Sequence, residues 1–239
     1  MTVCHRSRLA VVAALVLVAA TRAGTVTEST ATPAPTQALA ALLTAHEALS
    51  RPTAGSAPLE LVQAQRPLTG ERTVLPVLGH KTDAAGRRWL HVMLPGRPNG
   101  STGWIARSGT VSSTTPWHIV VDTGRRRVTV YLSGRPEHVF KAIVGKPSTP
   151  TPQGSFFVEE AVQLRASDVG APFALALSAR SDVLQEFDGG PGQIALHGLM
   201  NIGGVLGTAV SHGCVRLDND AMHWLVVRIG PGVPVTITS

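Results

Sequence analysis

The stretch Ser211-His212-Gly213-Cys214-Val215-Arg216-Leu217, preceded by Ile194-Ala195-Leu196-His197-Gly198, decides how the second half of the chain folds. Residues 194–196 are apolar and β-prone, so they predict a strand that ends at His197 and bends at Gly198. Thirteen residues separate His197 from Ser211, and they are rich in glycine. We therefore expect two strand ends to converge, with an imidazole within reach of the Cys214 thiol.

Cys214 is one of two cysteines in the chain, and Cys4 lies in an N-terminal segment that we expect to be removed. An unpaired thiol in an oxidising compartment is a liability unless it has a function. The acidic, helix-favouring segment 218–225 follows Cys214 directly. A helix start and a neighbouring imidazole lower the pKa of a thiol, so the sequence predicts a nucleophilic cysteine with a lowered pKa.

Two histidines, His197 and His212, compete to be the base that takes the thiol proton. His197 is favoured because it approaches from another strand, as in catalytic groups whose partners are distant in sequence. No carboxylate accompanies the motif, so the carbonyl of Gly198 is expected to hold the Nδ1 proton of His197. The N–H groups of Gly213 and Cys214 are candidate oxyanion donors at a tight bend, and His212 could help to line that hole.

A buried structural cysteine, or a zinc site made by His197, His212 and Cys214, would also account for these residues. The chain has neither a Cys-x-x-Cys nor a His-Glu-x-x-His pattern, and zinc would usually need a fourth protein ligand or an open catalytic position. We therefore expect no metal and no cofactor. Only His223 follows Cys214, which argues against papain-like peptidases, because these place the cysteine before the histidine.

Residues 1–23 have a basic start, an apolar run and small residues at Ala20 and Ala23, as in a secretory signal peptide. The apolar run is too short to span a bilayer comfortably, so the sequence predicts export to the periplasm or cell wall, with no integral membrane segment after cleavage. An uncleaved anchor is the alternative. Residues 24–57 are rich in Thr, Ala and Pro, which predicts a linker, with a possible short helix over 37–49.

The formal net charge is +6, with 21 basic and 15 acidic residues. Loss of the leader would remove Arg6, Arg8 and Arg22 and leave 18 basic residues. This mild excess suits association with anionic polymers of a cell surface. No dense basic patch interleaved with aromatic residues is present in the sequence, so a nucleic-acid partner is not expected.

Residues 58–113 alternate short β-prone runs with turns, on the scale of a small barrel. The run Trp89-Leu90-His91-Val92, followed by Gly103-Trp104-Ile105, resembles bacterial SH3-like domains. That resemblance implies an SH3-like β-barrel that binds the cell wall or acts as a spacer. Residues 117–239 again alternate strands and turns, beginning with a hairpin over 118–132.

The pair His197-Gly198 and the block Ser211–Leu217 resemble the signature of the L,D-transpeptidase (YkuD-like) catalytic domain. The earlier segment Thr149-Pro150-Thr151-Pro152-Gln153-Gly154 is similar to a second family motif. The resemblance implies a mainly β fold, a YkuD-like β-sandwich with short helices over residues 117–239.

By this resemblance Cys214 is the nucleophile and His197 the base. Gly198, His212 and Gly213 complete the catalytic block, and Arg216 and Ser211 are expected to bind substrate. The chain is then a peptidoglycan L,D-transpeptidase that acts on peptidoglycan stem peptides through a cysteine thioester, and we expect it to be a monomer. The alternatives are an L,D-carboxypeptidase that uses water as acceptor, and a non-catalytic wall-binding protein.

Overall fold

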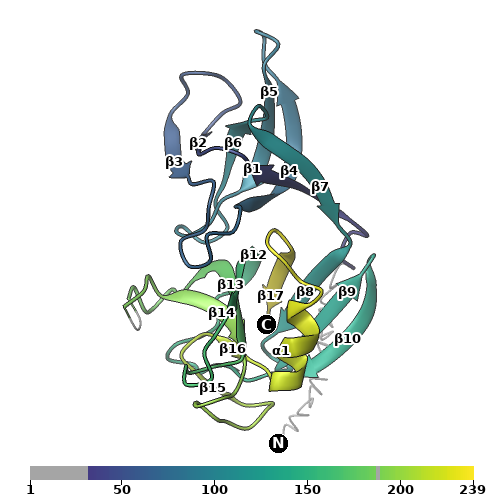
Figure 1. Cartoon of the computed structure of the whole chain (residues 1–239), viewed down its shortest axis with the longest axis vertical. Coiled ribbons are helices and arrows are strands. Elements are labelled where there is room, and N and C mark those ends of the chain that lie inside the picture. Colours follow the sequence, from purple (N-terminus) through teal and green to yellow (C-terminus); the bar gives the residue numbers. More distant parts are fainter. Residues whose placement is uncertain (1–31, 187–188) are drawn as a thin grey trace, which may run out of the picture. The chain divides into compact units, whose positions relative to one another are not determined.

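The computed structural model describes residues 32–186 and 189–239, and residues 32–239 form one compact unit. The expected signal peptide, with Cys4, and residues 24–31 of the expected linker lie outside the described residues. Within the described ranges the chain has seventeen strands and one helix, α1 (Asn219–Val226). The predicted mainly β class is therefore confirmed (Figure 1).

The N-terminal sheet contains seven strands in the order β3-β2-β6-β5-β4-β1-β7, and all its neighbours are antiparallel. In β5 and β6, His91 pairs with Trp104, and the two rings stack 4.8 Å apart. The seven strands are β1 (Gln37–Leu42), β2 (His46–Leu49), β3 (Pro58–Val62), β4 (Val74–Thr82), β5 (Arg88–Met93), β6 (Thr102–Ala106) and β7 (Thr110–Thr115).

The prediction of a linker with a short helix over residues 37–49 is wrong, because β1 and β2 occupy this segment. β1 lies between β4 and β7, and its residues Ala40 and Leu42 are fully buried in the core of the N-terminal sheet. The Ala/Leu-rich composition favours a helix only weakly. Strand pairing on both sides of β1 and burial of its alternate residues outweigh that preference.

The C-terminal sheet has eight strands in the order β10-β9-β8-β17-β12-β13-β14-β16, and β11 pairs with β15 in a separate two-stranded sheet. The predicted hairpin over 118–132 is confirmed by the antiparallel pairing of β8 and β9. The strands are β8 (Trp117–Asp122), β9 (Arg127–Leu132), β10 (Arg135–Lys141), β11 (Val144–Gly145), β12 (Gly154–Gln163), β13 (Phe173–Arg180), β14 (Gln193–His197), β15 (Ala209–Ser211), β16 (Val215–Arg216) and β17 (Pro234–Thr238).

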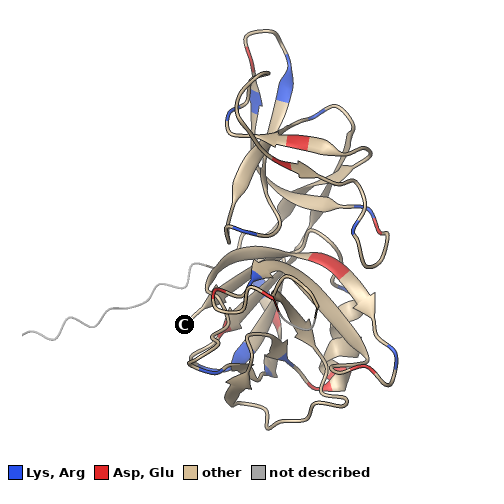
Figure 2. Ribbon diagram, turned by 90° about the vertical axis from the view of Figure 1, so that its left-hand side faces the viewer, with Lys and Arg blue, Asp and Glu red and all other residues tan. Residues whose placement is uncertain are grey.

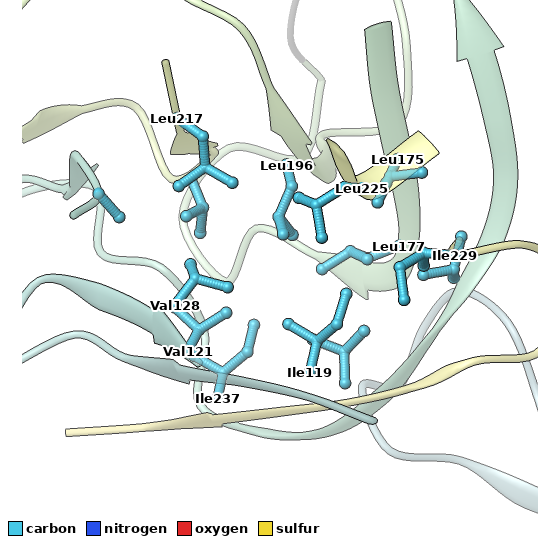
Figure 3. Close-up of a cluster of buried hydrophobic side chains, with 14 of the residues drawn as sticks. Ile119, Val121, Val128, Leu175, Leu177, Leu196, Leu217, Leu225, Ile229 and Ile237 are labelled. Atoms are coloured by element: carbon cyan, nitrogen blue, oxygen red, sulfur yellow. The ribbon is translucent and has the colours of Figure 1, made fainter. Parts of the chain in front are cut away.

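The two ends of the C-terminal sheet share one hydrophobic core. Figure 3 shows Ile119, Val121 and Val128 on one side of this core, facing Leu196 and neighbouring side chains on the other. Burying one apolar face of each strand in a common core fixes which side chains point away from it. The strands that carry the reactive residues are thus held in a single register.

The N-terminal sheet and the C-terminal sheet are joined by buried contacts. Phe157 of β12 is fully buried in the hydrophobic cluster of the N-terminal sheet. The next residue but one, Glu159, is 1% exposed and forms ion pairs with Arg66 and Arg180. Breaking a buried ion pair leaves an uncompensated charge, so this network disfavours separation of the two sheets. Elsewhere, basic and acidic residues are interspersed over both sheets (Figure 2).

Candidate active site

Strands β14 and β16 bring the two predicted motifs side by side. They pair in parallel, with Leu196 opposite Val215 and His197 opposite Arg216. Leu196 and Val215 point into the core, so the alternation of a strand sends the intervening side chains to the opposite face. Cys214 directly precedes β16 and shares that opposite face with His197 and Arg216. The predicted convergence of two strand ends is therefore present.

These side chains line a cavity of about 170 Å³. Its reactive lining consists of His197, His212, Cys214 and Arg216, and its apolar lining includes Val169 and Ile202. A larger hollow of about 640 Å³ is lined by the connections between β1 and β2 and between β3 and β4, and it contains none of these four side chains. The smaller cavity is the candidate site because a thiol, an imidazole and a guanidinium meet there.

His197 is oriented by the neighbouring residue, as the sequence predicts. Its Nδ1 lies 2.9 Å from the carbonyl oxygen of Gly198. A carbonyl oxygen can only accept, so Nδ1 donates its proton and Nε2 is left as the acceptor of the neutral ring. Burial lowers the pKa of His197, and the nearby Arg216 lowers it further, while the bond to Gly198 opposes both effects. The ring is thus kept neutral, as a base must be.

Two glycines make room for the His197 ring and its carbonyl partner. A methyl group on Gly170 would collide with Nδ1 of His197, and Gly170 has a φ of +83°. A methyl group on Gly198 would collide with the backbone of Ala171. The amide of Leu199 then donates a 3.0 Å hydrogen bond to the side chain of Asn219 at the start of α1. The segment after the histidine is therefore fixed on both sides.

The Cys214 thiol is half-buried, and its Sγ lies 3.9 Å from the carbonyl oxygen of Gln193, to which it donates. Burial raises the pKa of the thiol, and the N–H of Ala195 and the charge of Arg216 oppose this rise only in part. The predicted lowering of the pKa of Cys214 is therefore wrong. Helix α1 does not begin at the thiol, because β16 separates Cys214 from Asn219.

Ser211 supports the turn that carries the thiol. Its side chain is fully buried, its Oγ donates to the carbonyl oxygen of Cys214 over 2.6 Å, and it accepts from the N–H of Gly213 over 3.1 Å. The structure does not support the expectation that Ser211 binds substrate, since the hydroxyl is enclosed within the turn. The Gly213 N–H, a predicted oxyanion donor, donates to Ser211 Oγ instead.

Gly213 is required by the shape of this turn. Its φ is +124°, and an added methyl group would lie 3.0 Å from Cδ1 of Ile194 and 3.6 Å from the carbonyl oxygen of Pro150. A side chain at this position would meet both strain and crowding. The turn therefore brings Cys214 close to β14 only because residue 213 has no side chain.

Thr149 and Thr151 hold the same turn from behind, although neither is a predicted site residue. Their hydroxyls are buried and donate to the carbonyl oxygens of Ser211 (3.2 Å) and Gly213 (2.8 Å). Thr151 Oγ1 also accepts from the N–H of Gly145 over 2.9 Å. The prolines of this segment mark a stiff loop, but no local pattern indicates that its hydroxyls reach a turn sixty residues away.

His212 and Arg216 are placed differently in the cavity. His212 is exposed, and its Nε2 lies 3.5 Å from Nζ of Lys146. Arg216 is 8% exposed, with Nη1 3.5 Å from the carbonyl oxygen of Gly203 and a buried Nε that has no hydrogen-bond partner. A largely buried guanidinium with spare donor capacity can bind a carboxylate. Arg216 is therefore the cation of the site.

Within the described ranges, no group of three His, Cys, Asp or Glu side chains is placed to hold a metal ion. The same ranges contain no helix of sufficient length and apolarity to cross a membrane. A thiol and a neutral imidazole that share one cavity can carry out nucleophilic acyl transfer. The fold and the site together thus define a β domain that carries a thiol and a neutral imidazole in one cavity.

Comparison with known proteins assigns the C-terminal part of the chain to a family. Residues 116–237 match the YkuD model, the L,D-transpeptidase catalytic domain. The YkuD protein of Bacillus subtilis (strain 168), whose name places it among the L,D-transpeptidases, is 32% identical over 127 residues, covering 52% of this chain and 67% of that protein. The Bacillus licheniformis protein of the same name is 30% identical over 128 residues, with the same coverage. The chain belongs to the L,D-transpeptidase family.

A solved structure of L,D-transpeptidase 3 from Mycobacterium tuberculosis, in complex with a faropenem-derived adduct, is also similar to this chain. The identity is 16%, the match covers 83% of this chain and 97% of that chain, and the TM-score is 0.47.

Proposed function

We propose that the protein is a peptidoglycan L,D-transpeptidase that forms cross-links through a thioester on Cys214. The observation that carries this proposal is that Cys214 and His197 line one cavity, with the Nδ1 proton of His197 held by Gly198. Nε2 is then the acceptor for the thiol proton. Membership of the L,D-transpeptidase family supports the substrate class, which is the peptide stem of peptidoglycan.

In the acylation step, His197 Nε2 takes the proton of the Cys214 thiol as Sγ attacks a carbonyl carbon of the donor stem. This carbon belongs to the third stem residue, whose amide bond joins it to the terminal D-alanine. The imidazolium then returns the proton to the amine of D-alanine as the carbon–nitrogen bond breaks. The products are free D-alanine and an acyl group bound to Cys214 as a thioester.

In the second step, an amine of a neighbouring stem attacks the thioester carbonyl. His197 accepts a proton from that amine as the new amide bond forms. The carbon–sulfur bond then breaks, and the imidazolium returns the proton to the sulfur, which restores the thiol. If water attacks instead, the product is a shortened stem, and the enzyme is an L,D-carboxypeptidase. The acceptor that reaches the thioester decides between these two activities.

A raised pKa of the resting thiol fits this proton transfer. Since burial disfavours both the thiolate and the imidazolium, the pair rests as neutral thiol and neutral imidazole. Charge then develops only as the thiol attacks a bound carbonyl. The N–H of Cys214 is our candidate oxyanion donor, because Ser211 occupies that of Gly213. His212 lies at the exposed edge of the same cavity.

We assign to Arg216 the binding of an anionic group of the stem peptide. Its largely buried guanidinium lies beside the thiol and keeps an unpartnered Nε. A carboxylate of the stem would bind to the part of this guanidinium that lines the cavity. The same charge would also oppose a buried imidazolium, which keeps His197 available as a base.

The decisive experiment incubates the protein with a disaccharide-tetrapeptide and analyses the products by mass spectrometry. A cross-linked dimer with release of D-alanine is expected, and it should be lost in Cys214→Ala. A shortened stem without dimer would identify the carboxypeptidase. Intact-mass detection of a carbapenem adduct on wild type, absent from Cys214→Ala, would show the acyl-enzyme. If the wild-type protein gave no product and formed no adduct, the result would favour a non-catalytic wall-binding protein.

We further propose that the protein acts as a monomer outside the cytoplasm, in the periplasm or cell wall. The signal-like sequence at residues 1–23 supports export. The N-terminal sheet is proposed to be an SH3-like module that contacts the cell wall, on the strength of the Trp89 and Trp104 strands. Sedimentation of the full chain with purified, protein-free sacculi tests this contact.

A further inference from the structure

Arg97, in the loop between β5 and β6, reaches from the N-terminal sheet to the C-terminal sheet. Its Nη1 donates to the carbonyl oxygen of Pro191 over 2.9 Å. Its Nη2 donates to the carbonyl oxygens of Ser181 (2.8 Å) and Leu184 (3.2 Å). One guanidinium therefore holds together two segments of the C-terminal domain that are separate in the chain. A planar fork with five donors suits such a bridge, which a lysine cannot fully reproduce.

The segments that Arg97 holds form part of the wall of the Cys214 cavity. Ser181, Leu184 and Gly192 all line it. Gly192 has a φ of +65°, and a methyl group there would collide with the carbonyl group of Leu184 and lie 3.4 Å from Nη2 of Arg97. The close approach of these segments thus depends on a glycine on one side and on the arginine on the other.

A second residue of the same loop strengthens the contact. The side-chain amide of Asn99 donates to the carbonyl oxygen of Arg180 over 2.7 Å and accepts from the N–H of Arg180 over 2.8 Å. It also donates to a carboxylate oxygen of Asp182 over 3.0 Å. The N–H of Gly96 donates to the carbonyl oxygen of Ser178 over 3.2 Å. The loop is therefore fastened along the end of β13.

The contact leads to the reacting thiol through the main chain. Pro191 and Gly192 are followed directly by Gln193, the first residue of β14. The carbonyl oxygen of Gln193 accepts from Sγ of Cys214, and Gln193 also lines the cavity. A shift of the Pro191 carbonyl would thus move the cavity lining at Gly192 and Gln193. Small misplacements of groups remote from the reacting atoms can cost a large factor in rate.

We infer that Arg97 is a positioning residue for the substrate cavity, through which the N-terminal sheet shapes the site where the donor stem binds. Arg97 contributes no reacting group. It acts by fixing the Ser181–Leu184 and Pro191–Gly192 segments of the cavity lining. This inference rests on the proposed function, since the ligand of that lining is taken to be the stem peptide. It gives the N-terminal sheet a part in donor recognition that is separate from any binding to the cell wall.

The test compares Arg97→Ala, Arg97→Lys and wild type on a soluble disaccharide-tetrapeptide. We expect kcat/KM to fall about tenfold or more in Arg97→Ala, mainly through KM, with partial recovery in Arg97→Lys. The rate of alkylation of Cys214 by iodoacetamide, a small reagent that needs no contact with the cavity lining, should change less than twofold. Arg107→Ala, at an exposed arginine in the turn between β6 and β7, is the matched control and should retain wild-type kinetics.

Gly192→Ala disturbs the same contact from the C-terminal side. It should also lower kcat/KM for the peptide while leaving the rate of Cys214 alkylation nearly unchanged. Amide hydrogen exchange provides a measurement that does not depend on turnover. Exchange should rise in peptides covering residues 181–186 and 189–193 of Arg97→Ala, while strands β8 and β9 keep their protection. Equal loss of alkylation and peptide activity, or a lowered thermal midpoint with general exchange, would show a merely structural contact and overturn the inference.

The two proposals fail in different ways. A wild-type protein that neither cross-links nor shortens the stem refutes the proposed function, and the exchange data then decide on the contact alone. An active wild type with unchanged KM in Arg97→Ala refutes the inference and leaves the proposed function intact.

Discussion

The hydroxyl of Ser211 donates a 2.6 Å hydrogen bond to the carbonyl oxygen of Cys214, three residues along the chain. The hydroxyl oxygen also accepts from the N–H of Gly213, so one buried group closes the turn that presents the thiol. A hydroxyl that satisfies a donor and an acceptor of the main chain is a structural group. Its position in the motif is explained by the turn, without contact to substrate.

Ser211→Ala should therefore lower both stability and turnover. Loss of the hydroxyl leaves two buried main-chain groups without their partner, which should reduce the free energy of unfolding by about 1–3 kcal/mol. In the peptide assay kcat should fall while KM stays close to the wild-type value, because the nucleophile is displaced and the cavity lining is not. Urea denaturation and steady-state kinetics measure the two effects. An increase in KM alone would restore the substrate-binding interpretation of Ser211.

Thr151→Val is expected to resemble Ser211→Ala, because both hydroxyls hold the same turn. The substitution keeps the shape of the side chain and removes the bonds to Gly213 and Gly145. We expect a loss of about 1–2 kcal/mol in unfolding free energy, together with a slower acylation of Cys214. Thr82→Val, at an exposed position of β4, is the control and should be neutral. Wild-type acylation in Thr151→Val would show that this loop does not position the nucleophile.

The thiol should behave as a cysteine with a raised pKa in the resting protein. Because burial raises the pKa of Cys214, its alkylation by iodoacetamide should keep increasing with pH beyond the range in which an ordinary thiol, with a pKa near 8.5, levels off. Glutathione, measured in parallel, supplies the reference curve. A plateau already below pH 7 would instead indicate a preformed thiolate and imidazolium pair. The conclusion that the pair rests in its neutral form would then be wrong.

The strand that ends at His197 could be predicted from the sequence, and so could its convergence with the segment that carries Cys214. The bond from His197 to the Gly198 carbonyl could also be predicted, because no carboxylate lies nearby in sequence. These features depend on strand period and on adjacent residues. What could not be predicted depends on contacts distant in sequence. The hydroxyls of Thr149 and Thr151 reach residues 62 positions away.

The segment over residues 37–49 and the pKa of Cys214 show the same limit. An Ala/Leu-rich segment becomes two strands only because other strands are available to pair with it. The pKa of the thiol is set by how deeply the whole fold encloses it, and a local motif does not reveal that enclosure. The Arg97 contact likewise joins residues more than eighty positions apart.

The protein should lose stability on acidification through His118 of β8. Burial lowers the pKa of this ring from its ordinary value of 6.5 to about 4, and its Nε2 lies 2.8 Å from Oγ1 of Thr236. Between pH 6.5 and about pH 4, His118 is therefore protonated in the unfolded chain and remains neutral in the folded chain. Above pH 6.5 the ring is neutral in both states, and protonation does not destabilise the fold. As the pH falls toward 4, His118 lowers the free energy of unfolding by at most about 3 kcal/mol.

Urea denaturation of wild type and His118→Gln at pH 7 and pH 4.5 measures this contribution. The glutamine can keep a polar contact with Thr236 and does not titrate, so the variant should lose less stability on acidification than wild type. His80→Gln, at an exposed position, is the control and should follow wild type. Parallel pH profiles of wild type and His118→Gln would show that the ring is not protected from protonation by the fold.

Catalysis should depend on the empty space beside His197. A methyl group on Gly170 would collide with Nδ1 of His197, the atom that binds the Gly198 carbonyl, and a φ of +83° adds strain for any side chain. Gly170→Ala should therefore displace the ring and reduce kcat at least tenfold, because the base no longer faces the thiol. Gly230→Ala is the matched control, since an added methyl group there meets no atom within 4 Å. If Gly170→Ala keeps full activity at wild-type thermal stability, the orientation of His197 by its carbonyl partner is not what prepares the base, and His212 becomes the residue to test.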